Sequence, residues 1–101
     1  MKAIYLIKDN DTNYYKIGIS GNPEKRFNSL NSSNPNHLQL IYHSSKRKDA
    51  RLIEKHLHTH FKQYKVPHKE WFNITEEDVK FIIHQIECVI SIYEEKERFK
   101  I

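Results

Sequence analysis

The sequence predicts an α/β protein of the α+β type, a small three-stranded antiparallel sheet flanked by helices. Two segments near the N-terminus, residues 3–8 and 14–19, are rich in β-branched and aromatic residues, and turn-forming residues lie between them. A helix start follows at residue 22, and from about residue 49 the apolar residues recur at helical spacing. These observations predict the order β-β-α-β-α-α in one domain that spans residues 1–101.

The first two strands are expected to form a hairpin. Ala3 to Lys8 makes the first strand and Tyr14 to Ile19 the second, while the polar run from Asp9 to Asn13 supplies the turn. Gly18 lies within the second strand, where a glycine marks either a weak point or a close approach to the backbone.

The first helix is expected to begin after Asn22, which caps it, with Pro23 in the first helical position and Glu24 in the first turn. It should end by Asn31, because the polar residues that follow are typical of a loop. The segment from Leu38 to Tyr42 then predicts a third strand.

A second helix is predicted from Asp49 onward, and its apolar residues share one face: Ala50, Ile53, Leu57, Phe61 and Tyr64. Glu54 and His58 lie one step round the helix, at the edge of this face. Pro67 prevents the helix from continuing.

The last helix is predicted to begin after Thr75, which caps it together with Asp78, while Ile74 and Val79 form a hydrophobic staple. The charged residues 94–100 are expected to form a frayed tail. The buried face of this helix is predicted to comprise Val79, Ile82, Ile83, Ile86, Val89, Ile90 and Tyr93.

The amino-acid composition indicates where the protein works more clearly than what it does. Lys and Arg number 17 against 13 acidic residues, and the net charge of +4 mildly favours a polyanionic partner. The single cysteine, Cys88, excludes a disulfide framework and favours an intracellular location, in the cytoplasm or in a host cell's cytoplasm or nucleus. No apolar run reaches the roughly 18–20 residues that a membrane span needs, and the apolar N-terminal segment is too short for a signal peptide.

Five short motifs follow one another along these elements, and they contain residue types that can bind a phosphodiester, hold a metal ion or activate water. In order they are Tyr5, Lys16-Ile17-Gly18, Arg26, Glu54 and a closing Glu70-Trp71-Phe72-Asn73. This order and spacing resemble the GIY-YIG nuclease superfamily. The closest resemblance is to a branch from bacteriophages, bacteria and large DNA viruses that carries KIG in place of YIG and ends in a Glu-Trp-Phe segment. The match covers nearly the whole chain.

The resemblance implies a metal-dependent endonuclease that hydrolyses DNA phosphodiester bonds with one Mg²⁺ or Mn²⁺ ion. Tyr5 would position or activate a water, and Lys16 and Arg26 would neutralise the scissile phosphate. Glu54 would hold the metal ion, and His58 beside it would assist proton transfer.

Two further residues are weaker candidates for contacts with nucleic acid or for orienting the site. Asn73 matches the asparagine that often comes last in the family's series. Tyr15 points to the other face of the strand from Lys16, so it cannot replace the tyrosine that the second motif usually contains. Lys16, which takes that place, is normally charged and cannot act as a base, and this role would fall to Tyr5.

The charged candidates also have structural interpretations. Arg26 could form a salt bridge with Glu24 or Glu54 instead of binding a phosphate. Glu54 could hydrogen-bond to His58, four residues further along the same helix.

The closing segment and the other histidines have structural interpretations too. Trp71 and Phe72 are expected to close the core by docking the last helix. His56 and His60 could form an i,i+4 pair of metal ligands, but they lie opposite the apolar face, which argues against a zinc site.

Two other classes of function are compatible with the sequence. A lysine in the tyrosine position suits a module that binds nucleic acid without cutting it. A regulatory protein-interaction domain on the same fold is the other class, and it predicts that Tyr5, Arg26 and Glu54 need not converge. A lone domain of this size has little surface for sequence recognition, so specificity should be weak, directed by nucleic-acid structure, or supplied by a homodimer or a separate DNA-binding partner. The sequence does not distinguish DNA from RNA.

Overall fold

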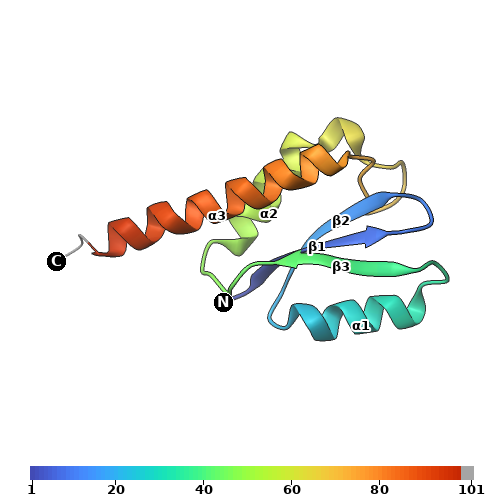
Figure 1. The fold of residues 1–101 in the computed structure, drawn as a ribbon, viewed down its shortest axis with the longest axis horizontal. Helices are drawn as coiled ribbons and strands as arrows, with labels where there is room; N and C mark the ends of the chain where they lie inside the picture. The colour runs from blue at the N-terminus through green and yellow to red at the C-terminus, as the bar shows by residue number, and fades with distance from the viewer. Residues whose placement is uncertain (99–101) are drawn as a thin grey trace.

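The sheet has three antiparallel strands in the order β2-β1-β3, with α1 on one face and α2 and α3 on the other (Figure 1). A computed structural model describes the backbone of residues 1–98 and the side chains of residues 1–88. The expected order β-β-α-β-α-α is confirmed, with a short 3₁₀ turn, η1, added after α2. The elements are β1 (Ala3–Asp9), β2 (Tyr14–Ser20), α1 (Pro23–Ser33), β3 (Leu38–His43), α2 (Ala50–His60), η1 (Lys62–Tyr64) and α3 (Glu76–Arg98).

Alternating side chains of β1 divide the core into two parts. Ile4 and Leu6 belong to the larger cluster, which lies beneath α2 and α3. Tyr5 and Ile7 point to the opposite face, where they pack with Leu38 and residues of α1. Tyr5 is therefore held on the α1 face of the sheet, and it pairs across the hairpin with Gly18 of β2.

Helix α1 begins as predicted and ends later than predicted. The Asn22 side chain accepts a hydrogen bond from the Lys25 N–H at 3.1 Å, and Pro23 follows as the first helical residue. The expected end at Asn31 is wrong, because the helix continues to Ser33. The hydroxyl groups of Ser32 and Ser33 donate to helix carbonyls four residues earlier, which keeps these residues within the helix.

Helix α2 ends at His60, so the expectation that Tyr64 shares its buried face is wrong. Phe61 leaves the helical conformation with φ −99° and ψ 14°, and its N–H donates to the Leu57 carbonyl. The chain then tightens into η1, where Tyr64 is 44% exposed. Ala50, Leu57 and Phe61 are buried as predicted.

Helix α3 starts with the predicted capping box. The Asp78 N–H donates to the Thr75 hydroxyl at 3.1 Å, and the Thr75 N–H donates to the Asp78 carboxylate at 3.0 Å. Ile82 and Ile86 are fully buried. The backbone stays helical to Arg98, so the predicted fraying is wrong for residues 94–98, while residues 99 and 100 lie outside the described backbone. The predicted burial of Val89, Ile90 and Tyr93 lies outside the described side chains.

The segment before α3 runs along the free edge of β2. Phe72 and Tyr15 exchange backbone hydrogen bonds of 2.8 and 2.9 Å. Phe72 enters the large cluster beneath α2 and α3, but Trp71 packs with the small cluster on the α1 face. The expectation that Trp71 docks the last helix is therefore wrong. Successive residues of an extended segment point to opposite faces, so only one of the two could do so.

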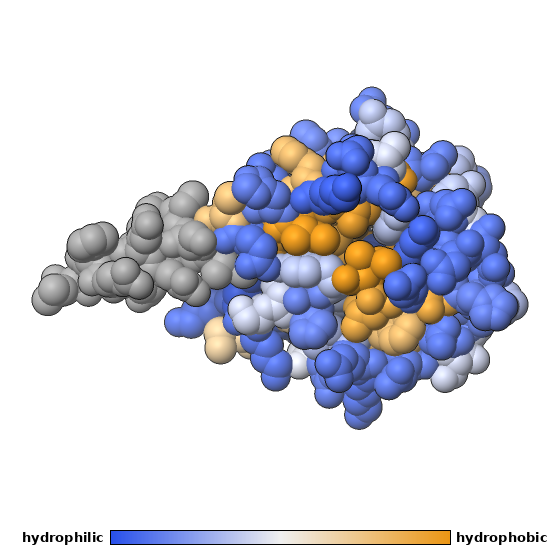
Figure 2. Space-filling view, viewed as in Figure 1, coloured by the Kyte–Doolittle hydropathy of each residue, from blue (hydrophilic) through white to orange (hydrophobic). Residues whose placement is uncertain are grey.

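Apolar residues reach the surface near the middle of the face drawn in Figure 2, where the sheet meets its covering helices, and hydrophilic residues surround them. Leu52 and Phe81 are the large apolar side chains of α2 and α3 that are most exposed among the described residues. Within the described residues, no helix combines the length and the apolar character that crossing a membrane requires.

Candidate active site

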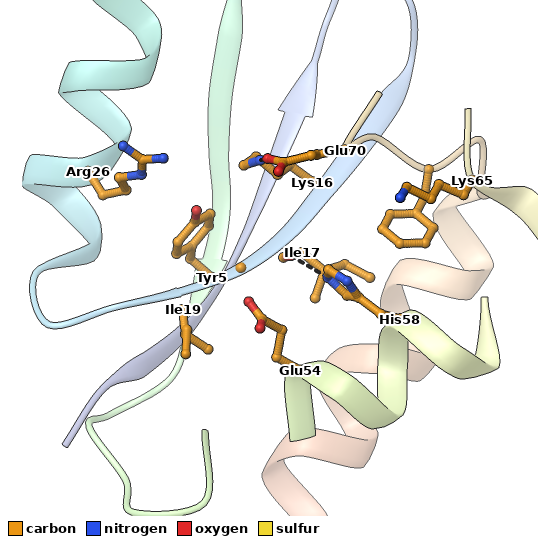
Figure 3. A pocket seen from close by; sticks show the side chains of 11 residues that line it. Tyr5, Lys16, Ile17, Ile19, Arg26, Glu54, His58, Lys65 and Glu70 are labelled. Atoms are coloured by element: carbon orange, nitrogen blue, oxygen red, sulfur yellow. Dashed lines mark hydrogen bonds and ion pairs between the residues drawn. The ribbon is translucent and has the colours of Figure 1, made fainter. Parts of the chain in front are cut away.

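A polar cleft of about 310 Å³ opens at the free edge of β2, between α1 and α2 (Figure 3). Phe72 covers one end of this edge by backbone pairing, and the cleft occupies the part beyond it. The residues that line it come from five segments of the chain: Tyr5, Lys16, Ile17, Gly18, Ile19, Arg26, Glu54, His58, Lys65, Glu70 and Phe72.

Tyr5 reaches the cleft because Gly18 has no side chain. A Cβ atom on Gly18 would lie 2.4 Å from both Cζ and the hydroxyl oxygen of Tyr5, which is far inside van der Waals contact. The ring is almost completely buried, 3% exposed, yet it lines the cleft. Of the two interpretations of Gly18, the close approach to the backbone is the one that the structure shows.

Lys16 is a buried lysine, and among the described residues its ion-pair partner is Glu70. Its Nζ atom lies 2.7 Å from Oε2 of Glu70, and the side chains are 10% and 81% exposed, respectively. The hydrogen bond from Lys16 and then its charge lower the pKa of Glu70, and they outweigh the opposing effect of burial; the charges of Lys65 and Arg26 lower the pKa a little further. The Glu70 carboxylate is therefore an anion in a positively charged environment.

Arg26 extends from the first turn of α1 toward the same place. Figure 3 shows its guanidinium on one side of the Tyr5 hydroxyl, with Lys16 and Glu70 on the other side. The side chain is exposed and has no ion pair within the described residues, so the structure does not show the proposed salt bridge with Glu24 or Glu54. The helix dipole disfavours a positive charge near a helix N-terminus, so Arg26 gains no stabilisation from its place in α1.

Glu54 enters the cleft from α2, on the opposite face of the sheet. It is half-buried, and its carboxylate points into the cleft toward Tyr5 (Figure 3). Among the described residues it has no ion pair and no side-chain hydrogen bond, so the expected bond to His58 is not formed. This carboxylate is accessible to a ligand.

His58 is held by the edge strand instead. Its Nε2 atom donates to the Ile17 carbonyl at 2.7 Å, and the ring meets the edge of Phe72 with 5.1 Å between centroids. A carbonyl oxygen can only accept a hydrogen bond, so Nε2 carries a proton and Nδ1 is the nitrogen that is able to exchange one.

Two candidates do not join the cleft. Tyr15 is buried in the large cluster on the other face of β2, as its register relative to Lys16 predicts, and touches the site only through its backbone pairing with Phe72. Asn73 is exposed and does not line the cleft. Its N–H donates to the Tyr64 carbonyl at 2.7 Å.

The two histidines that were considered as zinc ligands lie outside this cleft. His56 and His60 stack with 6.3 Å between ring centroids, outside the cleft. No group of three or more His, Cys, Asp or Glu side chains that could hold a metal ion occurs among the described residues.

Two charged residues of the cleft, Glu70 and Lys65, were not predicted from the sequence. In the sequence Glu70 only begins the segment that closes the core, although its position before Trp71 and Phe72 on an extended chain could have indicated a constrained carboxylate. Lys65 carries no such signal, because it reaches the cleft through an isolated β-bridge with Phe72 that follows η1.

The fold and the cleft define a small α+β domain with a charged site at the open edge of its sheet. The chain belongs to the T5orf172 domain family, whose model matches residues 2–87. This range contains every residue that lines the cleft. No curated protein and no solved structure matches the chain.

Proposed function

We propose that this protein is a metal-dependent endonuclease of the GIY-YIG type that hydrolyses DNA phosphodiester bonds. The observation that carries the proposal is the convergence of Tyr5, Lys16, Arg26 and Glu54, from four separate elements, in one cleft. Membership of the T5orf172 family supports a DNA-related role. Convergence also argues against the regulatory interaction domain, which does not require these residues to meet.

The residues fit a single Mg²⁺ or Mn²⁺ ion held by one carboxylate. Glu54 is half-buried, directed into the cleft and without a charged partner among the described residues. Mg²⁺ commonly binds through one or two carboxylates, keeps several waters and takes further ligands from a phosphate, so a cage of protein ligands is not required. The ion would supply Lewis-acid polarisation of the phosphate and would orient the leaving oxygen.

The remaining residues would act on the phosphate and on water. Arg26 and Lys16 flank the Tyr5 hydroxyl, so a phosphate between them would receive two positive charges while its negative charge increases in the transition state. The Tyr5 hydroxyl would orient the attacking water. His58 would accept or donate a proton through Nδ1, because Nε2 is fixed on Ile17.

A nucleic-acid-binding module without catalysis is the second candidate. One observation favours it: Lys16 forms an ion pair where the GIY-YIG superfamily usually has a tyrosine, and a protonated lysine cannot remove a proton from water. This candidate predicts that the cleft binds DNA and that loss of Glu54 changes no product. In either case a homodimer or a separate DNA-binding partner would supply specificity.

Plasmid nicking tests the two candidates directly. Supercoiled DNA is incubated with Mg²⁺ or Mn²⁺ and with wild type, Glu54→Gln or the control Glu76→Gln, which changes an exposed carboxylate at the start of α3. We expect wild type and Glu76→Gln to nick equally and Glu54→Gln to lose at least about 100-fold in rate. Equal nicking by all three proteins would reject Glu54 as the metal ligand. DNA binding without cleavage in wild type would favour the second candidate.

A further inference from the structure

The carboxylate of Glu70 lies in the cleft but has no role in the proposed hydrolysis. It lies 2.7 Å from the Lys16 ammonium, and Arg26 and Lys65 line the same cavity. All three cations stabilise its negative charge and lower the pKa of Glu70. The place for an anion beside the Lys16 ammonium is thus already occupied by a group of the protein itself.

The two partners of this ion pair differ in how firmly they are held. Lys16 is buried within β2, which is paired along its whole length with β1. Glu70 is 81% exposed and follows a turn in which His68 adopts a left-handed φ of 61°. Phe72, two residues further along the chain, is fixed by pairing with Tyr15, so the Glu70 side chain can rotate into solvent without disturbing the sheet.

We propose that Glu70 is a removable counter-ion that occupies the place of a substrate phosphate, and that Lys16 exchanges it for a phosphodiester oxygen when nucleic acid enters. This inference rests on the proposed function for the identity of its substrate. In the absence of ligand, Glu70 is the anion that pairs with the Lys16 ammonium in the cleft.

The exchange makes the cleft selective for polyanions. A single phosphate or a carboxylate that displaces Glu70 replaces one anion beside Lys16 with another and gains little. A polynucleotide presents consecutive phosphates, so contacts with Arg26 and Lys65 add to the exchange at Lys16. Glu70 thereby weakens the binding of small anions more than the binding of nucleic acid.

Titration with inorganic phosphate tests this inference without any need for cleavage. Phosphate is added to isotope-labelled protein, and the amide signals of Lys16 and Gly18 report binding by NMR. We compare wild type, Glu70→Gln and Glu76→Gln, because the last removes the same charge outside the cleft. We expect Glu70→Gln to bind phosphate roughly three- to tenfold more tightly than Glu76→Gln, as removal of a competing ion-pair partner implies.

The double variant Lys16→Met/Glu70→Gln locates the bound phosphate. Loss of the gain in this variant supports exchange at Lys16, whereas a retained gain places the phosphate elsewhere and overturns the proposal. A gain within twofold of Glu76→Gln also overturns it. These outcomes are separate from the nicking assay: a gain in a protein that does not cut DNA preserves the exchange and rejects the nuclease, and nicking without a gain does the reverse.

Discussion

Two arginines in this molecule show what distinguishes a charge that holds the fold from a charge that is available to a ligand. Arg47 is buried, with 8% of its side chain exposed; it pairs with Asp49 and donates through Nη1 to the Ile86 carbonyl at 3.2 Å. Arg26 is exposed, faces the cleft and has no ion pair among the described residues. Within the described part of the chain, the fold pairs the first charge with a buried carboxylate and leaves the second without an ion pair, near Tyr5 and Glu70 in the cleft.

The same contrast holds for the carboxylates around them. Asp49 is only 15% exposed beside Arg47, whereas Glu54 has no ion-pair partner among the described residues, and Glu70 pairs with Lys16 from a solvent-exposed position. Charges near Arg47 should therefore affect stability, and charges in the cleft should affect binding and catalysis. Four experiments test this division, in decreasing order of the expected effect.

The largest effect is expected from Arg47→Met. The substitution keeps an unbranched apolar stem but leaves Asp49 and the Ile86 carbonyl without their donor, which should lower the free energy of unfolding by about 3 kcal/mol. Urea denaturation at neutral pH measures the loss. Arg51→Met, on the exposed surface of α2, is the matched control and should stay within about 0.5 kcal/mol of wild type. A loss below about 1 kcal/mol for Arg47→Met would contradict the structural role.

Arg26→Met should lower the nicking rate without lowering stability, the opposite of what is expected for Arg47→Met. We expect the urea midpoint to stay unchanged and the nicking rate to fall about 100-fold, which corresponds to about 2.7 kcal/mol of transition-state stabilisation. Arg26→Lys should recover only part of the rate, because an ammonium does not reproduce the planar fork of a guanidinium. A large change in stability with an unchanged rate would place Arg26 in the same class as Arg47.

A smaller effect is expected where the backbone positions Tyr5. Gly18→Ala introduces a Cβ atom 2.4 Å from the Tyr5 hydroxyl, so the ring must turn away from its place in the cleft. We expect about a tenfold loss of nicking rate, with a modest loss of stability because the outer end of the ring is what moves. Gly21→Ala is the control, since nothing lies within 4 Å of its added Cβ. Equal rates for both variants would mean that the position of Tyr5 is unimportant.

Local sequence rules predicted most of the fold, and they failed where a distant contact decides the outcome. The hairpin, the Asn22 cap and the Thr75–Asp78 capping box depend on neighbouring residues and could be predicted from them. The direction of Trp71 could not, because it depends on the pairing of Phe72 with Tyr15, far away in the sequence. The end of α1 was missed because serine hydroxyls, which usually favour loops, here bond back to the helix.

The site was predictable in part for the same reason. The order of Tyr5, Lys16, Arg26 and Glu54 along the chain is visible in the sequence, and the sheet and two helices bring them into one cleft. The partner of Lys16 lies 54 residues away on a loop, and no periodic pattern connects the two. A carboxylate in such a position is recognised only when the cleft is known in three dimensions.

The smallest expected effect is a pH dependence of stability, which should be found for Asp49 and not for Glu70. The hydrogen bond from Arg47, and then its charge, lower the pKa of Asp49 below the ordinary value of 3.8. A carboxyl group with a lowered pKa in the folded state contributes stability that is fully present above its unfolded pKa and is lost as the pH falls through its folded pKa. Removing Asp49 should therefore matter at neutral pH and matter progressively less below about pH 4.

Urea midpoints between about pH 7 and pH 2.5 measure this dependence for wild type, Asp49→Asn and Glu70→Gln. We expect the difference between wild type and Asp49→Asn to narrow as the pH falls. Glu70→Gln should follow wild type at every pH, although the pKa of Glu70 is also lowered, because solvent screens an ion pair whose carboxylate is 81% exposed. A pH-dependent loss of stability in Glu70→Gln would mean that the Lys16–Glu70 pair holds the fold, as the Arg47–Asp49 pair does, and is not free to exchange its carboxylate for a phosphate.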